Sequence, residues 1–247
     1  KDLYDKYMEL SRNYRNYFDP ETKLMRGRLS DGSWITPFDP ASVQRPSNYV
    51  EGNAWQWAWF VPQDVEGLME LVGGQKSFEA HLDTLFTTSS ELTGDPNAAA
   101  DVTGMIGQYA HGNEPSHHIP YLYNYAGAPR KTQALVDHIL RTLYHNDPNG
   151  LSGNEDVGQM SAWYALSAMG FYSFCRGRPV YEIGRPIFDK VTIHLSNGKD
   201  FVIQAKNNSV ENKYIRSMKL NGEELAEPRF SHFDLMKGGE LIFEMEN

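Results

Sequence analysis

Residues 191–205, VTIHLSNGKDFVIQA, are the clearest β-hairpin in the sequence. Apolar side chains alternate with polar ones at Val191, Ile193 and Leu195, and the alternation resumes after the Asn197–Gly198 pair. An Asn-Gly pair between two alternating segments favours a tight turn whose twist matches that of antiparallel strands. The sequence therefore predicts two antiparallel strands joined at Asn197–Gly198.

Outward from this hairpin, the spacing of apolar residues changes near Arg176. Downstream, further alternating segments cover residues 215–220 and 240–245. Upstream, apolar residues recur every three or four positions, which is typical of amphipathic helices. Helices are predicted over residues 3–17, 53–60, 65–72, 76–86, 115–125, 131–144 and 159–171. We therefore predict an α+β protein with a helical domain at residues 1–175 and a small antiparallel β-rich domain at residues 176–247.

Composition limits the classes of partner. The 247 residues carry a formal charge of −9, and residues 1–175 hold all of it, because acidic and basic residues balance from Arg176 onward. This charge makes nucleic acid and anionic membrane surfaces unfavourable partners, and no apolar run is long enough for a membrane span. The first residue is Lys1, so the numbering is expected to begin inside a longer precursor.

Three loops place a carboxylate directly ahead of a predicted helix. Their sequences are YVEGNAWQW at residues 49–57, HGNEPSHH at residues 111–118 and GNEDVGQMS at residues 153–161. In a stacked array of helical hairpins such loops can gather at one end. We therefore expect the three carboxylate-bearing loops to meet around one cavity.

Glu51 is the candidate proton donor. Tyr49 and three tryptophans surround it in sequence, and apolar surroundings raise the pKa of a carboxyl group, which keeps a general acid protonated near neutral pH. Trp and Tyr faces also stack on the apolar faces of sugar rings. The alternative is a purely structural role, in which Glu51 interacts with the dipole of the helix that follows.

Asn113, Glu114 and Asp156 offer the oxygen ligands that calcium or magnesium prefers. Zinc bound by histidines is a weaker alternative, because the HExxH spacing is absent. In the structural alternative, Asn113 caps the helix that starts at Pro115, and Asp156 caps the helix that starts at Gln159. The adjacent carboxylates of Glu155 and Asp156 repel each other, so a cation or a proton is expected between them.

At these loops the sequence resembles glycoside hydrolase family 92, the calcium-dependent α-mannosidases that act with inversion. The matching segments are VEGNAWQWAWFVPQDVEGLMELVGG, DVTGMIGQYAHGNEPSHHIPYLYNYAG and GNEDVGQMSAWYALSAMGFY, in family order, with a β-rich tail that includes NKYIRSMKLNGEEL. The resemblance covers the chain from about Tyr4 to its last residue. It implies that residues 1–175 form part of an (α/α)6 barrel, whose remainder belongs to the N-terminal part of the same precursor.

The resemblance also implies roles for single residues. Glu51 matches the general acid and Asp156 the general base, next to a Ca²⁺ ion that Asn113, Glu114 and Asp156 help to bind. The residues implied to bind the sugar are Trp55, Gln63, Asp64, His117 and Asn154. Two of these depart from the family pattern: Asn154 stands where many relatives have Asp, and Gln63 where His is common.

The resulting expectation is exo-acting hydrolysis of α-mannosides, α-1,2-linked, in N-glycan degradation, by a periplasmic or extracellular enzyme whose substrate is a mannose-containing glycan. Two alternatives remain open. One is a truncated or decayed module that binds mannosides or has a structural role, without catalysis. The other is a different (α/α)-barrel sugar enzyme, such as an epimerase, that needs no calcium.

Overall fold

The computed structural model describes residues 1–247, except for the side chain of residue 96. The chain divides into two compact units, unit 1 with residues Lys1–Ile119 and Ser152–Asn154, and unit 2 with Pro120–Leu151 and Glu155–Asn247. The predicted boundary at Arg176 coincides with neither unit's limits, and as a domain boundary it stays a prediction. It does mark the change from helices to strands, because a single short helix follows it in the described chain.

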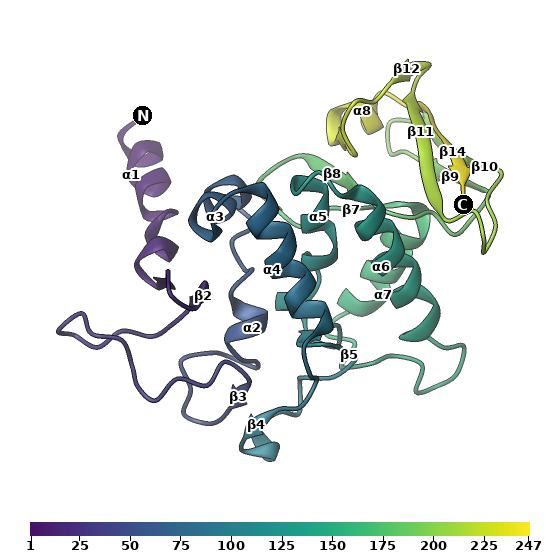
Figure 1. Ribbon diagram of the computed structural model, residues 1–247. Helices are drawn as coiled ribbons and strands as arrows, with labels where there is room; N and C mark the ends of the chain where they lie inside the picture. Colours follow the sequence, from purple (N-terminus) through teal and green to yellow (C-terminus); the bar gives the residue numbers. More distant parts are fainter. The chain divides into compact units, whose positions relative to one another are not determined.

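Unit 1 contains four α-helices, short strand pairs and long connecting loops (Figure 1). Its helices are α1 (Asp2–Leu10), α2 (Ala54–Trp57), α3 (Val65–Val72) and α4 (Gln75–Thr87), with 3₁₀ turns η1 (Asn13–Asn16), η2 (Pro96–Ala98) and η3 (Glu114–Ser116). Its strands are β1 (Phe18–Asp19), β2 (Leu24–Met25), β3 (Ser42–Val43), β4 (Thr93–Gly94), β5 (Met105–Ile106) and β6 (Tyr109–Ala110). The 3₁₀ turn η4 (Ile119–Tyr121) crosses from unit 1 into unit 2.

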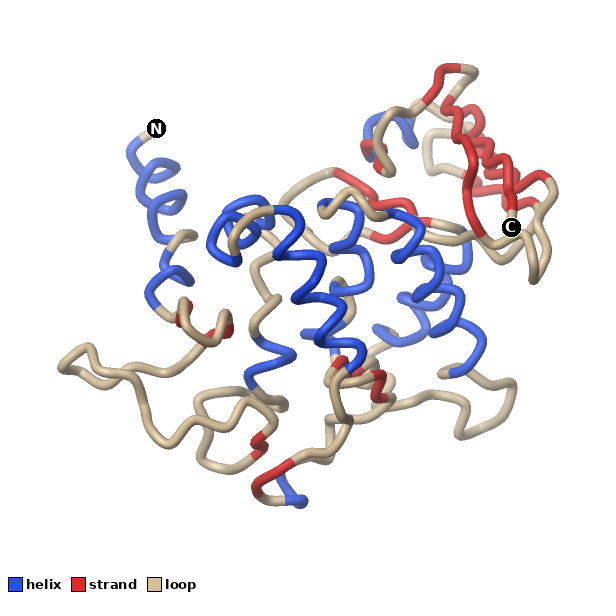
Figure 2. Tube along the Cα trace, viewed as in Figure 1, coloured by secondary structure: helices blue, strands red, loops and turns tan.

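Unit 2 contains the remaining helices and the longer strands, which Figure 2 shows in red. Its helices are α5 (Leu122–Tyr125), α6 (Pro129–Thr142), α7 (Gln159–Met169) and α8 (His232–Met236). Its strands are β7 (Phe171–Tyr172), β8 (Val180–Ile183), β9 (Lys190–His194), β10 (Asp200–Lys206), β11 (Tyr214–Leu220), β12 (Glu223–Glu224), β13 (Arg229–Ser231) and β14 (Gly239–Glu246). The predicted hairpin is present, since β9 and β10 pair antiparallel with Asp200 opposite His194.

The main sheet of unit 2 is mixed, which corrects the prediction of an antiparallel domain. Its strand order is β12-β11-β14-β10-β9, and β14 runs parallel to β10. Inward-facing residues of β10 and β14 alternate with outward ones, so Phe201, Ile203, Leu241 and Phe243 are almost fully buried in one core. That period-two burial is the pattern of a sheet with one buried face.

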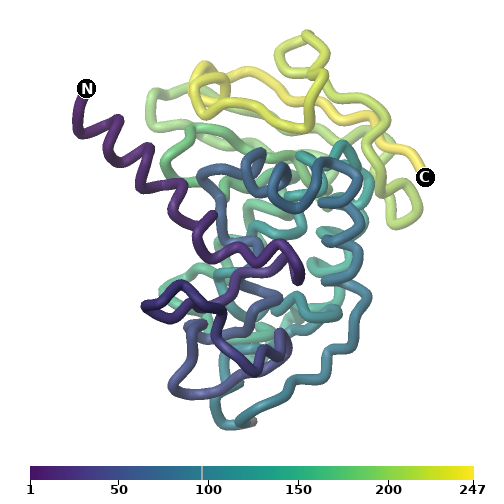
Figure 3. The backbone as a smooth tube through the Cα atoms, turned by 60° about the vertical axis from the view of Figure 1, so that its left-hand side comes forward, coloured from purple at the N-terminus to yellow at the C-terminus, as the bar shows by residue number. Residues whose placement is uncertain are grey.

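Three helix predictions were wrong in their extent. The helix predicted over residues 53–60 is only the four-residue α2. The helix predicted over residues 115–125 is instead two 3₁₀ turns and the short α5, because Pro120 lacks the N–H that a continuous helix needs in its interior. The helix predicted over residues 3–17 stops at Leu10 and gives way to η1. Figure 3 shows α1 in purple at the N-terminus, and none of its side chains is buried.

Candidate active site

The turn that carries Glu51 is held by the start of α2. Asn53 caps this helix, because its Oδ1 accepts the Trp55 N–H at 3.0 Å, and Gln56 Oε1 accepts the Asn53 N–H at 2.7 Å. This reciprocal capping box satisfies N–H groups that would otherwise have no partner inside the helix. Glu51 lies two residues earlier, and its side chain is exposed. The helix start therefore fixes the backbone next to an accessible carboxylate.

Both predicted catalytic carboxylates occur where the backbone is strained. Glu51 has φ +52°, Asp156 has φ +47°, and Val157 has φ +59°. For residues other than glycine this left-handed region costs about 1–2 kcal/mol each. Such conformations persist where the surroundings over-determine them, and they cluster at functional sites. The two turns therefore share an unusual backbone feature that sequence reasoning did not anticipate.

The structure brings Glu51 and Asn113 together, although they lie far apart in the sequence. Asn113 Nδ2 donates a hydrogen bond of 2.7 Å to the Glu51 carbonyl oxygen. Asn113 Oδ1 accepts the N–H of Glu114 at 3.2 Å, and Asn113 is the N-cap of η3, as the structural alternative predicted. Two of the three predicted loops therefore meet within unit 1, through a side chain that also caps a turn.

The third loop starts in unit 1 and ends in unit 2. Asn154 Nδ2 donates to Asp101 Oδ1 at 3.2 Å, and a Cβ added to Gly153 would collide with the Gly112 carbonyl oxygen. Residues 152–154 therefore pack directly against the loop that carries Asn113. Asp156 belongs to unit 2, so its separation from Glu51 stays a prediction.

Glu155 has partners that explain how it can neighbour Asp156. Its two carboxylate oxygens accept the Ser161 N–H at 3.1 Å and the Ser161 hydroxyl at 2.9 Å. Helix α7 begins after Gly158, which provides no capping side chain, so Glu155 interacts with the positive end of the helix instead. The Asp156 side chain is exposed. These contacts give Glu155 a structural role, and a cation or a proton between the two carboxylates stays a prediction.

The three histidines of the HGNEPSHH segment are buried. His117 Nε2 lies 2.9 Å from the His111 carbonyl oxygen, and His118 Nε2 lies 2.7 Å from the Trp59 carbonyl oxygen. Because a carbonyl oxygen can only accept, both rings carry their proton on Nε2. Burial, which penalises the charged form, lowers the pKa of His117 and of His118 to about 4. These contacts give both rings a structural role, and a sugar contact of His117 stays a prediction.

The surroundings of Asn113 and Glu114 bear on the predicted metal site. Among the described residues, no three His, Cys, Asp or Glu side chains cluster closely enough to hold a metal ion. The Asn113 loop is instead flanked by the buried hydroxyls of Thr103 and Ser116, which have no hydrogen-bond partner. Hydroxyl, amide and carboxylate oxygens are the donors of a hard cation, which needs six to eight oxygens when it is Ca²⁺. The oxygen atoms present fit a hard cation in chemical type, and Asn113 and Glu114 as calcium ligands stay a prediction.

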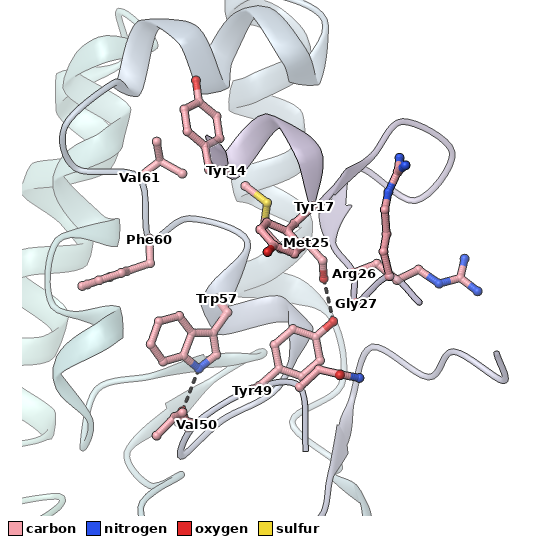
Figure 4. Close-up of a pocket in the computed structure, with 12 residues that line it drawn as sticks. Tyr14, Tyr17, Met25, Arg26, Gly27, Tyr49, Val50, Trp57, Phe60 and Val61 are labelled. Carbon is pink, nitrogen blue, oxygen red and sulfur yellow. Dashed lines mark hydrogen bonds between the residues drawn. The ribbon is translucent and has the colours of Figure 1, made fainter. Parts of the chain in front are cut away.

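Unit 1 has an open pocket of about 410 Å³, and its lining includes Tyr49 and Val50, the two residues before Glu51 (Figure 4). Tyr17, Tyr49, Val50, Trp57 and Phe60 form much of its wall. Two hydrogen bonds fix the aromatic rings: the Tyr49 hydroxyl donates to the Met25 carbonyl oxygen at 2.6 Å, and Trp57 Nε1 donates to the Val50 carbonyl oxygen at 2.7 Å. A pocket with mostly apolar walls and a few polar groups is typical of a small-molecule site.

The positive charge of Arg26 in the pocket wall is balanced by a neighbouring carboxylate. The Arg26 guanidinium lies 3.1 Å from the Asp19 carboxylate and also donates to the Ile35 carbonyl oxygen. A second, smaller hollow shares Arg26, Gly27, Asn48 and Tyr49 with this pocket. The two hollows therefore share part of their walls.

The other predicted sugar-binding residues make contacts inside unit 1. Asp64 caps α3 by accepting the Gly67 N–H at 3.1 Å, and it accepts the Tyr14 hydroxyl at 2.7 Å. Gln63 Nε2 donates to the Ser11 carbonyl oxygen at 3.1 Å. Trp57, not Trp55, lines the pocket described above. The family resemblance implied Trp55 as the sugar-binding tryptophan, and a sugar contact of Trp55 stays a prediction.

Comparison with known proteins identifies the family. A model described as the glycosyl hydrolase family 92 catalytic domain matches residues 1–247 of this chain. The chain belongs to glycoside hydrolase family 92. This family 92 chain resembles the solved α-mannosidase BT3965 from Bacteroides thetaiotaomicron in complex with mannoimidazole, with a TM-score of 0.88 and 42% identity over 94% of this chain and 31% of that one.

Two more relatives agree with the assignment. The inverting mannosidase BT2199 from Bacteroides thetaiotaomicron superposes with a TM-score of 0.86 and 40% identity, over 99% of this chain and 34% of that chain. An uncharacterized secreted glycosidase of Arthroderma benhamiae is 27% identical over 96% of this chain and 32% of its own length. The family 92 chain therefore spans about a third of the length of these relatives. The family match and the α+β arrangement confirm those two predictions from the sequence.

Proposed function

We propose that this chain carries acid and base residues of an enzyme that hydrolyses α-mannosides with inversion. The observation that carries the proposal is the Glu51 turn, in which an exposed side chain stands on strained backbone. The carbonyl oxygen of Glu51 accepts a hydrogen bond from Asn113, and the two residues before Glu51 line an aromatic pocket. The relatives support it, since two proteins of solved structure that are similar to this chain are named mannosidases, and one of them is named an inverting mannosidase.

In the proposed reaction, Glu51 donates its proton to the glycosidic oxygen while the bond from that oxygen to C1 of mannose breaks. The leaving sugar departs as a neutral alcohol. Asp156 accepts a proton from a water molecule, whose oxygen forms the new bond to C1 from the opposite face of the ring. Exchange with solvent then restores both carboxyl groups. Inversion requires the two carboxyl groups to stand about 6.5–9.5 Å apart, and we expect this separation for Glu51 and Asp156.

We propose Ca²⁺ as the cofactor, with Asn113, Glu114 and Asp156 among its ligands. When bound, such a cation supplies positive charge that polarises the hydroxyl groups of the sugar. The unpartnered hydroxyls of Thr103 and Ser116 beside the Asn113 loop support a polar or cationic ligand there. A chelator is expected to abolish turnover, and added calcium to restore it.

The substrate proposal is a mannose-containing glycan, cleaved from its end, with α-1,2-linked mannose in N-glycans as the preferred form. The aromatic wall of Tyr17, Trp57 and Phe60 supports a sugar ring as the ligand.

We further propose that the helices belong to an (α/α)6 barrel completed by an N-terminal part of the same precursor. We also propose that the protein acts in the periplasm or outside the cell, which agrees with a relative named as secreted. The described helices all fall short of the length and apolar character that a bilayer-crossing segment requires.

The test is release of mannose from an α-linked mannobiose by the full-length protein, followed by NMR of the first anomer formed. We expect β-mannose to form first, and we expect turnover to stop on chelation. Mannose bound but never released from the disaccharide would show instead a non-catalytic binding module. Full activity of metal-free protein on a free sugar would point to an epimerase.

A further inference from the structure

Gln108 joins the segments that hold the Glu51 turn, and nothing in the reaction above assigns it a role. Its side chain is 1% exposed. Its Nε2 donates to the carbonyl oxygens of Ser89 at 2.8 Å and Glu91 at 3.0 Å, and its Oε1 accepts Asn53 Nδ2 at 2.9 Å. The two carbonyl oxygens can only accept, which fixes the orientation of the carboxamide.

The backbone of Gln108 is tied down as firmly as its side chain. Its carbonyl oxygen accepts Gln56 Nε2 at 2.6 Å, and its N–H donates to the Leu85 carbonyl oxygen at 2.8 Å. Gly107, with φ +60°, allows this approach, because a Cβ there would collide with the Leu85 carbonyl oxygen. The exit of α4 therefore serves as the fixed support for Gln108.

Hydrogen bonds from this support reach the residues that follow the Glu51 turn, and Asn113 separately contacts the turn itself. On one side are the carboxamides of Asn53, Gln56 and Gln108, which are at most 3% exposed. All six of their side-chain nitrogens and oxygens have hydrogen-bond partners. On the other side, Asn113 donates to the Glu51 carbonyl oxygen and is five residues from Gln108 along the chain. A fully satisfied buried network of this kind specifies one arrangement of the elements it joins.

We infer that Gln108 is a positioning residue, which sets the place of the Glu51 carboxyl group through Asn53 and Gln56. The inference rests on the proposed role of Glu51 as the general acid. Gln108 is buried behind the turn and touches no reacting atom in this account. Its effect must therefore be on proton donation, and a displacement of a catalytic group by about 1 Å can cost on the order of a hundredfold in rate.

The test compares two substrates in the full-length protein. An α-linked mannobiose needs a proton on its leaving oxygen, whereas the dinitrophenolate of 2,4-dinitrophenyl α-mannoside leaves without one. We expect Gln108→Leu to lower kcat on mannobiose about 10- to 100-fold, with KM little changed, and to lower kcat on the aryl mannoside by less than about threefold. The matched control is Gln133→Leu in unit 2, which also removes a buried carboxamide, one that is 3% exposed and accepts the Ile215 N–H at 2.9 Å. The control should leave the ratio of the two rates unchanged.

A second variant, Gln108→Asn, tests the inference even if Gln108→Leu folds poorly. Gln108→Asn keeps the carboxamide but shortens its reach, so we expect a folded variant with an intermediate loss on mannobiose. In a Glu51→Gln background, either change at Gln108 should have no further effect on the rate ratio. Equal losses on both substrates, or a further loss in that background, would overturn the inference. If Glu51→Gln itself left the ratio unchanged, the proposed function would fail instead.

Discussion

Replacing Asn53 by Ala tests whether the buried amides hold the Glu51 turn. The change removes an N-cap, which costs about 1 kcal/mol, in the range of about 0.5–2. It also leaves Gln108 Oε1, now bonded to Asn53 Nδ2 at 2.9 Å, without a partner in a buried site. An unsatisfied buried acceptor costs about 1–3 kcal/mol. We therefore expect the free energy of unfolding to fall by about 2–4 kcal/mol.

The assay is urea unfolding followed by far-UV circular dichroism. The matched control is Ser231→Ala, which removes the cap of α8, an Oγ that accepts the Asp234 N–H at 3.0 Å, without leaving a buried amide unsatisfied. We expect the control to cost about 1 kcal/mol. Asn53→Asp separates the two costs, since it keeps the cap but leaves Gln108 Oε1 without a donor, and we expect it to cost about 1–3 kcal/mol. A loss at Asn53→Ala no larger than that of the control would refute the reasoning.

Three further predictions follow from the same structure. Tyr17→Ala should raise KM for α-mannobiose about 2- to 10-fold, since an aromatic contact contributes about 0.5–1.5 kcal/mol, while Tyr7→Ala, an exposed tyrosine of α1 outside the pocket, should not; equal KM values for both variants would remove the pocket from substrate binding. Burial lowers the pKa of His118 below its unfolded value, so the unfolded state binds more protons between about pH 6.5 and 4. The contribution of neutral His118 to the free energy of unfolding should be fully present above that range and should be lost as the pH falls through it. His118→Gln should therefore make the urea midpoint decline less steeply with falling pH. Val157→Gly relieves left-handed backbone at a fully exposed side chain and should raise the free energy of unfolding by about 0.5–1 kcal/mol, whereas a decrease would mean that the conformation is not strained.

The elements that the sequence predicted best are those whose signal is local. Gly73 in left-handed conformation ends α3 at Val72, as expected from the Gly-Gly pair, and the Asn-Gly hairpin of β9 and β10 forms as predicted. The parallel pairing of β14 with β10 could not be predicted, because it depends on a contact between segments far apart in the chain. Pro120 carried a signal against a continuous helix that the apolar spacing obscured.

For the candidate site, the sequence indicated which residues could act as acids, bases or ligands. It did not indicate which residues contact each other in the folded chain. Asn113 as a cap was one of two predicted readings, but its bond to the Glu51 carbonyl oxygen depends on tertiary structure. Gln108 was missed, because a glutamine between a glycine and a strand has no distinctive spacing in the sequence. Its proposed role depends on its burial in the folded chain, where only 1% of the residue is exposed. Glu155 as the partner of Ser161 likewise follows from the geometry at the start of α7.

The most direct test of the account is the rate of Glu51→Gln on the two α-mannosides with different leaving groups. An amide cannot donate the proton that a departing sugar needs, and general acid catalysis contributes about 10²- to 10⁴-fold. We predict a loss of that size in kcat on α-linked mannobiose and a loss of less than about tenfold on 2,4-dinitrophenyl α-mannoside. Equal rates for wild type and Glu51→Gln on mannobiose would contradict the central claim that Glu51 protonates the leaving oxygen.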